Sequence, residues 1–219
     1  MCVAECFLDL CFLVDQSGSI NFKDSSNWDK QLNFVANLTD RLTNGANAAQ
    51  VALIVFGDSA TVKWGLTQYR DKASLIAAIM NLRYPTDGEA TNLNYALYLT
   101  RTQIFAPGAG SRPSANKVTI IVTDGEDTEP VKGTVLTIQN ATACKNEGIR
   151  LIGIGVSEEV DTDRLLQIVS SPSDYYPVGD FNALPRLVID LTPTICVTST
   201  TTPAPPGPST TTYYLLYTF

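Results

Sequence analysis

Oxygen-bearing side chains stand at every second position directly after the first apolar run of the chain. The run at 8–14 leads into Asp15, and Ser17 and Ser19 follow it. A carboxylate and two hydroxyls in one tight loop can turn their oxygens toward a single point. Three such oxygens suit a hard cation such as Mg²⁺, Ca²⁺ or Mn²⁺. The spacing therefore predicts a site for a divalent cation.

A second carboxylate follows a later apolar run in the same way. The stretch at 118–123 leads straight into Asp124 and Gly125. In an open parallel sheet, ligands bind outside the carboxyl ends of the strands, at the point where the strand order reverses. The Asp-x-Ser-x-Ser pattern by itself also suits a solvated turn. Two strand ends that direct carboxylates into one crevice favour the metal site.

Apolar runs alternate with helical patterns along the chain. The runs predict strands at 8–14, 51–56, 60–66, 118–123, 151–156 and 175–178. Apolar residues at helical spacing predict helices at 28–42, 75–82, 93–104, 131–146, 165–169 and 181–191. The strand at 60–66 lies close enough behind the one before it to form a hairpin. This order predicts a doubly wound α/β fold with helices on both faces of a mostly parallel central sheet and one short antiparallel edge strand.

The composition indicates one globular domain followed by a tail. The chain has 219 residues, of which 44% are hydrophobic, and this is enough to bury a sizeable core. No apolar stretch is long enough to span a bilayer, so membrane insertion of this chain is not expected. From Thr198 to Thr212 almost every residue is Thr, Ser, Pro, Ala or Gly, which is typical of a stiff linker or an O-glycosylated stalk. We expect a domain at 1–197 and a disordered tail at 198–219.

Charge and residue usage exclude several classes of function. The formal net charge of −7 argues against a nucleic-acid partner, because such partners require a basic surface. The chain has no His, so the usual general base is missing, and Ser17 has no partner that would make it a nucleophile. The glycines at Gly153 and Gly155 lie inside an apolar run, which predicts close strand packing and not a dinucleotide loop. We therefore expect no enzymatic activity.

Cysteine usage favours an oxidising compartment. The chain has five cysteines, Cys2, Cys6, Cys11, Cys144 and Cys196. A bridge from Cys6 or Cys2 to Cys196 would join the two ends of the domain. Cys11 and Cys144 would then be buried free thiols or a second bridge.

Two glycosylation sequons point in the same direction. Asn37-Leu38-Thr39 and Asn140-Ala141-Thr142 are acceptors if the chain passes through the secretory route. No leader peptide is visible at the start of the sequence, and we expect it to have been removed or left out. Together with the cysteines, the sequons predict a secreted protein.

From roughly Asp9 to Leu191, the chain resembles a von Willebrand factor type A domain. The most specific element of that family is its metal-ion-dependent adhesion site. Its five liganding positions are matched by Asp15, Ser17, Ser19, Thr91 and Asp124. Many members carry a second Thr two residues after the first. Leu93 stands there in this chain, which removes a hydroxyl near the site but no ligand.

The resemblance implies a module that binds a protein through a metal. The five side chains would hold a divalent cation, Mg²⁺ first and Mn²⁺ or Ca²⁺ as alternatives, with its coordination shell left open. A Glu or Asp of an extracellular partner, with collagen the leading candidate, would complete the shell and make the ion a bridge. The implied setting is the extracellular matrix, as in the similar matrilin-type and invertebrate thread matrix proteins. Two other interpretations stay open: a structural assembly protein whose metal only stabilises the fold, and a shed receptor ectodomain.

Further acidic residues flank the expected ligand loops. They are Asp87, Glu89, Glu126, Asp127 and Glu129. Clustered like charges focus a local field, so these residues would raise the affinity for the cation or select basic residues in a partner, unless they only form a solvated rim.

Overall fold

A computed structural model of the chain describes residues 7–85, 90–125 and 131–196, with the backbone alone at 131–134. The strands are β1 (Leu8–Asp15), β2 (Ala49–Phe56), β3 (Ala60–Trp64), β4 (Asn116–Thr123), β5 (Ile149–Val156) and β6 (Tyr175–Val178). The α-helices are α1 (Asn27–Asp40), α2 (Lys72–Met80), α3 (Leu93–Leu99), α4 (Val131–Asn146), α5 (Thr162–Ile168) and α6 (Leu184–Cys196). Within the described ranges, none of the helices has both the length and the hydropathy that a membrane span requires.

The strands form one mixed sheet in the order β3-β2-β1-β4-β5-β6. β3 runs antiparallel to β2 at one edge, and the other neighbouring strands are parallel. The predicted doubly wound α/β fold, with its hairpin and its antiparallel edge strand, is thereby confirmed. Because β1 has β2 on one side and β4 on the other, the strand order reverses between β1 and β4. The carboxyl ends of these two strands therefore mark the switch point of the sheet.

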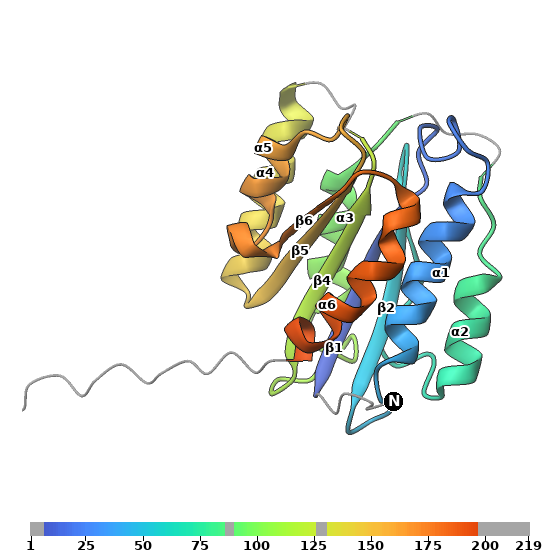
Figure 1. Cartoon of the computed structure of the whole chain (residues 1–219). Helices are drawn as coiled ribbons and strands as arrows, with labels where there is room; N and C mark the ends of the chain where they lie inside the picture. Colours follow the sequence, from blue (N-terminus) through green and yellow to red (C-terminus); the bar gives the residue numbers. More distant parts are fainter. Residues whose placement is uncertain (1–6, 86–89, 126–130, 197–219) are drawn as a thin grey trace, which may run out of the picture.

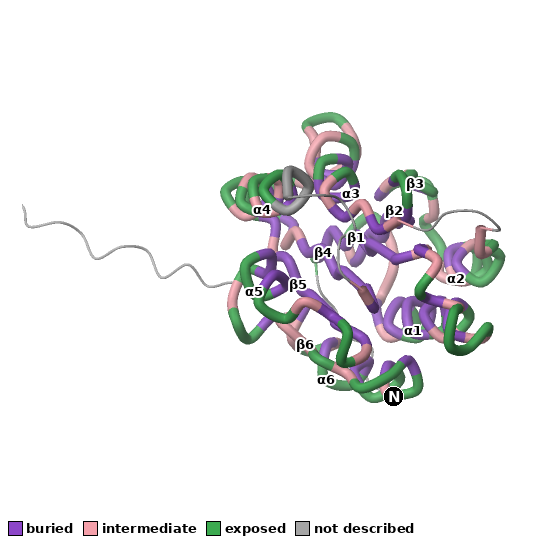
Figure 2. The backbone as a smooth tube through the Cα atoms, turned by 90° about the horizontal axis from the view of Figure 1, so that it is seen from above, coloured by how far each residue is buried: buried purple, intermediate pink, exposed green. Residues whose placement is uncertain are grey.

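Helices cover both faces of the sheet, so the central strands are buried on both sides (Figures 1 and 2). Every residue of β1 is buried. Leu10, Phe12 and Val14 pack in the core under α1, α2 and α6, whereas Cys11 and Leu13 pack in the core under α3, α4 and α5. Burial on both faces explains why the strand is continuously apolar from Leu10 to Val14. Asp9, near its start, is buried and pairs with Arg112.

The carboxyl-terminal ends of α3 and α6 each differ by five residues from their predicted positions, more than the ends of the other helices. The pattern at 93–104 predicts one helix, but α3 ends at Leu99 and a π-helical turn, Thr100–Ile104, completes the segment. The last helix was predicted to end at 191, and it continues to Cys196 with Pro193 inside it. Ile195 extends the apolar stripe of α6 and is buried, so burial outweighs the hydrogen bond that a proline removes.

Close packing accounts for the two glycines of β5, as their position in an apolar run predicts. A Cβ atom on Gly153 would stand 2.9 Å from Cγ1 of Val169. One on Gly155 would stand 2.9 Å from both the Tyr175 hydroxyl and Cγ1 of Val160. The side chains that cover β5 therefore leave no room for a methyl group at either position.

The substitution Gly155→Ala should destabilise the fold by about 1–3 kcal/mol, because the added methyl group overpacks a tight contact. Gly65→Ala is the matched control, since nothing lies within 4 Å of a Cβ atom there, and it should be neutral or slightly stabilising. Urea denaturation measures both variants. Equal free energies of unfolding for the two would contradict the packing account.

Candidate metal site

The predicted ligands from the two strand ends meet at the switch point of the sheet. Asp15 is the last residue of β1, and Asp124 directly follows β4, the neighbouring strand. Ser17 and Ser19 lie in the loop that leads from β1 toward α1. The parallel arrangement of β1 and β4 places both loops at one edge of the sheet (Figure 1).

Hydrogen bonds join these four residues into one network. The Ser19 hydroxyl donates to Oδ1 of Asp124 at 2.7 Å, and the Ser17 and Ser19 hydroxyl oxygens are 3.0 Å apart. The backbone N–H of Ser17 donates to Oδ1 of Asp15 at 2.8 Å. Residues that are more than a hundred positions apart in the sequence thus hold their oxygens around one point, as a cation site requires.

Thr91, which entered only through the family resemblance, also belongs to this edge of the sheet. It is buried, and the backbone N–H of Ala90 before it donates to Oδ1 of Asp58 at 2.6 Å. Thr91 lines the same small cavity as Thr123 and Gly125 at the end of β4. The turn between β2 and β3 therefore holds the loop of Thr91 beside the end of β4.

The electrostatics of the two carboxylates suit a bound cation. Burial and, to a smaller extent, the charge of Asp124 raise the pKa of Asp15 to about 7, against hydrogen bonds from Ser17 and Thr123 that lower it. Burial likewise raises the pKa of Asp124, against the hydrogen bond from Ser19. In the protein without metal, two desolvated carboxylates repel each other at this edge. A divalent cation supplies the missing positive charge, so the site fits one.

The donor set consists of oxygen atoms alone. In the part of the chain that the structure describes, no three His, Cys, Asp or Glu side chains gather in a way that could hold a metal. The candidate site instead combines two carboxylates with the hydroxyls of two serines and one threonine. Oxygen donors of this kind suit Mg²⁺, Mn²⁺ or Ca²⁺ better than the softer metals that prefer thiolate.

Three residues that support the ligands were not predicted from the sequence. The Thr123 hydroxyl donates to Oδ2 of Asp15 at 2.6 Å, and the side-chain amide of Gln31 donates to the Asp15 carbonyl oxygen at 3.0 Å. The Tyr84 hydroxyl donates to the Ser17 carbonyl oxygen at 2.6 Å. Gln31 could have been suspected, because it is a polar residue among the buried positions of α1. Tyr84 gives no local signal.

The cysteines fall into two groups. Cys11 and Cys144 are buried free thiols, which is one of the two predicted alternatives. Burial raises the pKa of both thiols, so they stay protonated and unreactive. Cys196 is disulfide-bonded, whereas Cys2 and Cys6 lie outside the described residues. The identity of the partner of Cys196 therefore stays a prediction.

Peptide mapping under non-reducing conditions should find Cys196 linked to Cys6 or Cys2. The link would tie the segment before β1 to the end of α6 and restrict the ends of the chain in the unfolded state. Reduction should release the two peptides and lower the melting temperature. A free Cys196 thiol in the oxidised protein would refute the link.

The remaining predicted positions stay untested. Asn37 is exposed on α1, where a glycan has room, whereas the side-chain amide of Asn140 donates to Oδ1 of Asn94 at 2.6 Å. A glycan on Asn140 would have to break that contact. The acidic residues predicted to flank the site all lie outside the described residues: Asp87, Glu89, Glu126, Asp127 and Glu129.

Comparison with known proteins agrees with the geometry of the site. The family model described as von Willebrand factor type A domain matches residues 9–189 of the chain. The chain belongs to this family. Its similarity to known members is spread over the whole A domain, and the relatives are proteins of the matrix with no enzymatic role. The expectation that the chain is no enzyme agrees with this membership.

Relatives of this A domain include collagens and matrilins. The chain is 30% identical over 197 residues to the collagen alpha-1(XII) chain of Notophthalmus viridescens, covering 89% of this chain and 20% of the relative. It is 29% identical over 191 residues to human matrilin-1, covering 86% of this chain and 36% of the relative. The chain thus spans about a fifth to a third of the length of these relatives.

The chain is also similar to a solved structure of a protein from the mussel byssus. Proximal thread matrix protein 1 from the mussel byssus, described as having a zinc occupied MIDAS motif, is 26% identical with a TM-score of 0.80. The alignment covers 90% of this chain and 47% of the thread protein. MIDAS denotes the metal-ion-dependent adhesion site, so a relative of this A domain holds a divalent cation in that motif.

Proposed function

We propose that this A domain is an adhesion module of the extracellular matrix that binds a protein through a divalent cation. The cation, Mg²⁺ in our proposal, is held by five side chains: Asp15, Ser17, Ser19, Thr91 and Asp124. The observation that carries the proposal is the network in which hydroxyls from the β1 loop reach the carboxylate after β4. A partner's Glu or Asp completes the site.

The chemistry of the side chains explains why the site would accept a further carboxylate. The two aspartates balance the two positive charges of the ion, whereas the serine and threonine hydroxyls add neutral oxygens. The bound cation supplies a strong, short-range attraction for an anionic oxygen. Thr123 and the Ser17 backbone keep Asp15 oriented through two hydrogen bonds, so little rearrangement accompanies binding of the partner.

The family context supports a secreted protein with a protein partner. The relatives are collagens, a matrilin and a thread matrix protein, and the disulfide at Cys196 suits an oxidising compartment. We propose collagen as the first partner to test, on the resemblance alone. The Thr- and Pro-rich segment at 198–219 would act as a linker beyond the domain.

Capture from a matrix extract tests the proposal. The immobilised chain should retain a protein in Mg²⁺, release it in EDTA, and retain it again when Mg²⁺ is restored. Retention that is the same in Mg²⁺ and EDTA would overturn the metal bridge. It would instead support a structural assembly protein in which the metal only stabilises the fold.

A further inference from the structure

A cavity of about 340 Å³ adjoins the candidate metal site. It lies among the loop that follows β1, the segment after β5 and the turn before α6. Ser19 and Asp124 are among the residues that line it, so the cavity adjoins two of the proposed metal ligands. Its size, at the lower end for ligand pockets, suits one large side chain. A residue close to a metal-bound carboxylate could therefore enter it.

The cavity has an apolar wall that reaches the surface. Val156 and Phe181 line it from the core and are buried. Phe22 also lines it and is 86% exposed, the highest value among the exposed large hydrophobic residues of the described chain. Ser157, another lining residue, has a φ of 87°, a backbone conformation that costs free energy and gathers at binding sites. The wall offers an exposed ring to the apolar part of an incoming side chain.

Acidic groups outnumber basic groups around this cavity. Both lysines that line it are paired at 2.7 Å, Lys23 with Glu159 and Lys30 with Asp24. A positive side chain of a partner would therefore meet lysines whose charges are already balanced. An acidic side chain would have to compete with those two pairs.

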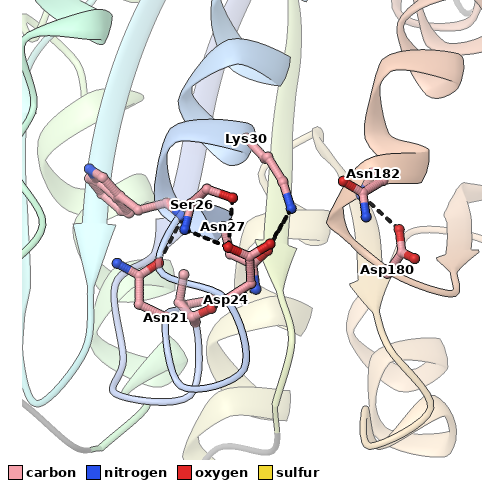
Figure 3. Close-up of polar contacts among 9 residues, drawn as sticks. Asn21, Asp24, Ser26, Asn27, Lys30, Asp180 and Asn182 are labelled. Atoms are coloured by element: carbon pink, nitrogen blue, oxygen red, sulfur yellow. Dashed lines mark hydrogen bonds and ion pairs between the residues drawn. The ribbon is translucent and has the colours of Figure 1, made fainter.

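Of the carboxylates that line the cavity, Asp180 is the one that is neither a proposed metal ligand nor paired with a lysine. Its Oδ1 accepts the backbone N–H of Asn182 at 2.7 Å, and it makes no ion pair with any described residue. Figure 3 shows Asp180 and Asn182 on the turn before α6, across from the pair of Lys30 and Asp24 on the α1 side. An uncharged occupant would desolvate Asp180 without returning a partner, which disfavours it.

We propose that this cavity binds an Arg or Lys side chain of the same protein partner that gives its carboxylate to the metal. The aliphatic stem lies along Phe22, and the cationic head pairs with Asp180. This inference rests on the proposed function and deepens it. The module would recognise an acidic and a basic residue that lie close together on the surface of the partner.

Synthetic peptides test the inference. Each probe is an acetylated glycine peptide amide with one Glu and one Arg separated by one to three glycines, and its twin carries neutral citrulline in place of Arg. Titration in Mg²⁺, followed by NMR, should give about five- to tenfold tighter binding for the Arg form of at least one spacing. The Asp180→Asn variant should lose this preference, since Asn still caps the turn but has no charge.

Two further variants test the contribution of Phe22 and control for the change in net charge. Phe22→Ala removes an exposed ring and no core contact, and it should weaken binding of the Arg peptide and of its citrulline twin alike, because both peptides carry the same aliphatic stem. Asp190→Asn changes the net charge equally at an exposed position of α6 outside the cavity lining, and it should keep the full preference. A preference that survives in Asp180→Asn would overturn the inference.

The metal dependence separates this inference from the proposed function. Equal binding of Arg and citrulline peptides that EDTA abolishes would overturn the cavity assignment and leave the metal bridge standing. A preference for Arg that persists in EDTA would support the cavity and contradict the bridge. Absence of binding in every arm would overturn both.

Discussion

Addition of Mg²⁺ or Mn²⁺ is expected to raise the melting temperature of the protein by about 5–10 °C at a hundredfold excess over Kd. A cation that binds only the folded site stabilises it by RT ln(1 + [L]/Kd), which is about 2.7 kcal/mol at that excess. For a domain of this size each kcal/mol shifts Tm by about 2–4 °C. Differential scanning calorimetry, with EDTA as the reference condition, measures the shift.

The Asp124→Ala variant should lose this response. It removes one of the two carboxylates and the acceptor of the Ser19 hydroxyl. The metal-free variant should fold as well as the wild type, because it also removes the charge that disfavours ionised Asp15. Asp190→Ala, an exposed aspartate on α6, is the matched control and should keep the full shift. An unchanged response to metal in Asp124→Ala would reject the assignment of the site.

Loss of a single ligand hydroxyl should weaken binding to the partner by at least about tenfold at a subsaturating Mg²⁺ concentration. Ser17→Ala removes one hydroxyl oxygen, whereas Thr91→Ala removes a hydroxyl oxygen and a buried methyl group. Ser17→Ala should keep the metal-free melting temperature of the wild type, and Thr91→Ala should lower it no more than Thr91→Ser, which also lacks the methyl group. Surface plasmon resonance on immobilised collagen measures the affinity, and circular dichroism checks the fold.

A rescue variant and a salt series sharpen this second prediction. Thr91→Ser keeps the hydroxyl and should bind nearly as the wild type does, which separates loss of a ligand from loss of packing. Affinity should fall only modestly between low and high salt, because a bridge at contact distance is screened much less than long-range attraction. A steep dependence on salt, or a Thr91→Ser variant as weak as Thr91→Ala, would count against the metal bridge.

The residues at the two strand ends could be predicted because their signals are local. β1 and β4 are apolar runs since both faces of a central parallel strand are buried, and a carboxylate directly after each run must lie at the carboxyl edge. Thr91 has no such signal, because a contact between Asp58 and the backbone before it holds its loop in place. It was found through the family resemblance.

Other parts of the site depend on contacts that no short pattern encodes. Tyr84 reaches the Ser17 carbonyl oxygen across 67 positions of sequence. The cavity lined by Asp180 is built from four segments that meet only in the folded chain. The end of α6 was misplaced for a related reason, since Pro193 signals a helix end locally whereas burial of Ile195 decides the outcome.

The most direct test of the account is one collagen surface in a plasmon resonance instrument, exposed to the chain in Mg²⁺, then in EDTA, then in Mg²⁺ again. The account predicts binding in the first step, loss of binding in the second and full recovery in the third. Recovery excludes irreversible unfolding as the cause of the loss, and circular dichroism in EDTA checks that the domain stays folded. Binding that continues unchanged in EDTA would contradict the claim that a cation joins this domain to its partner.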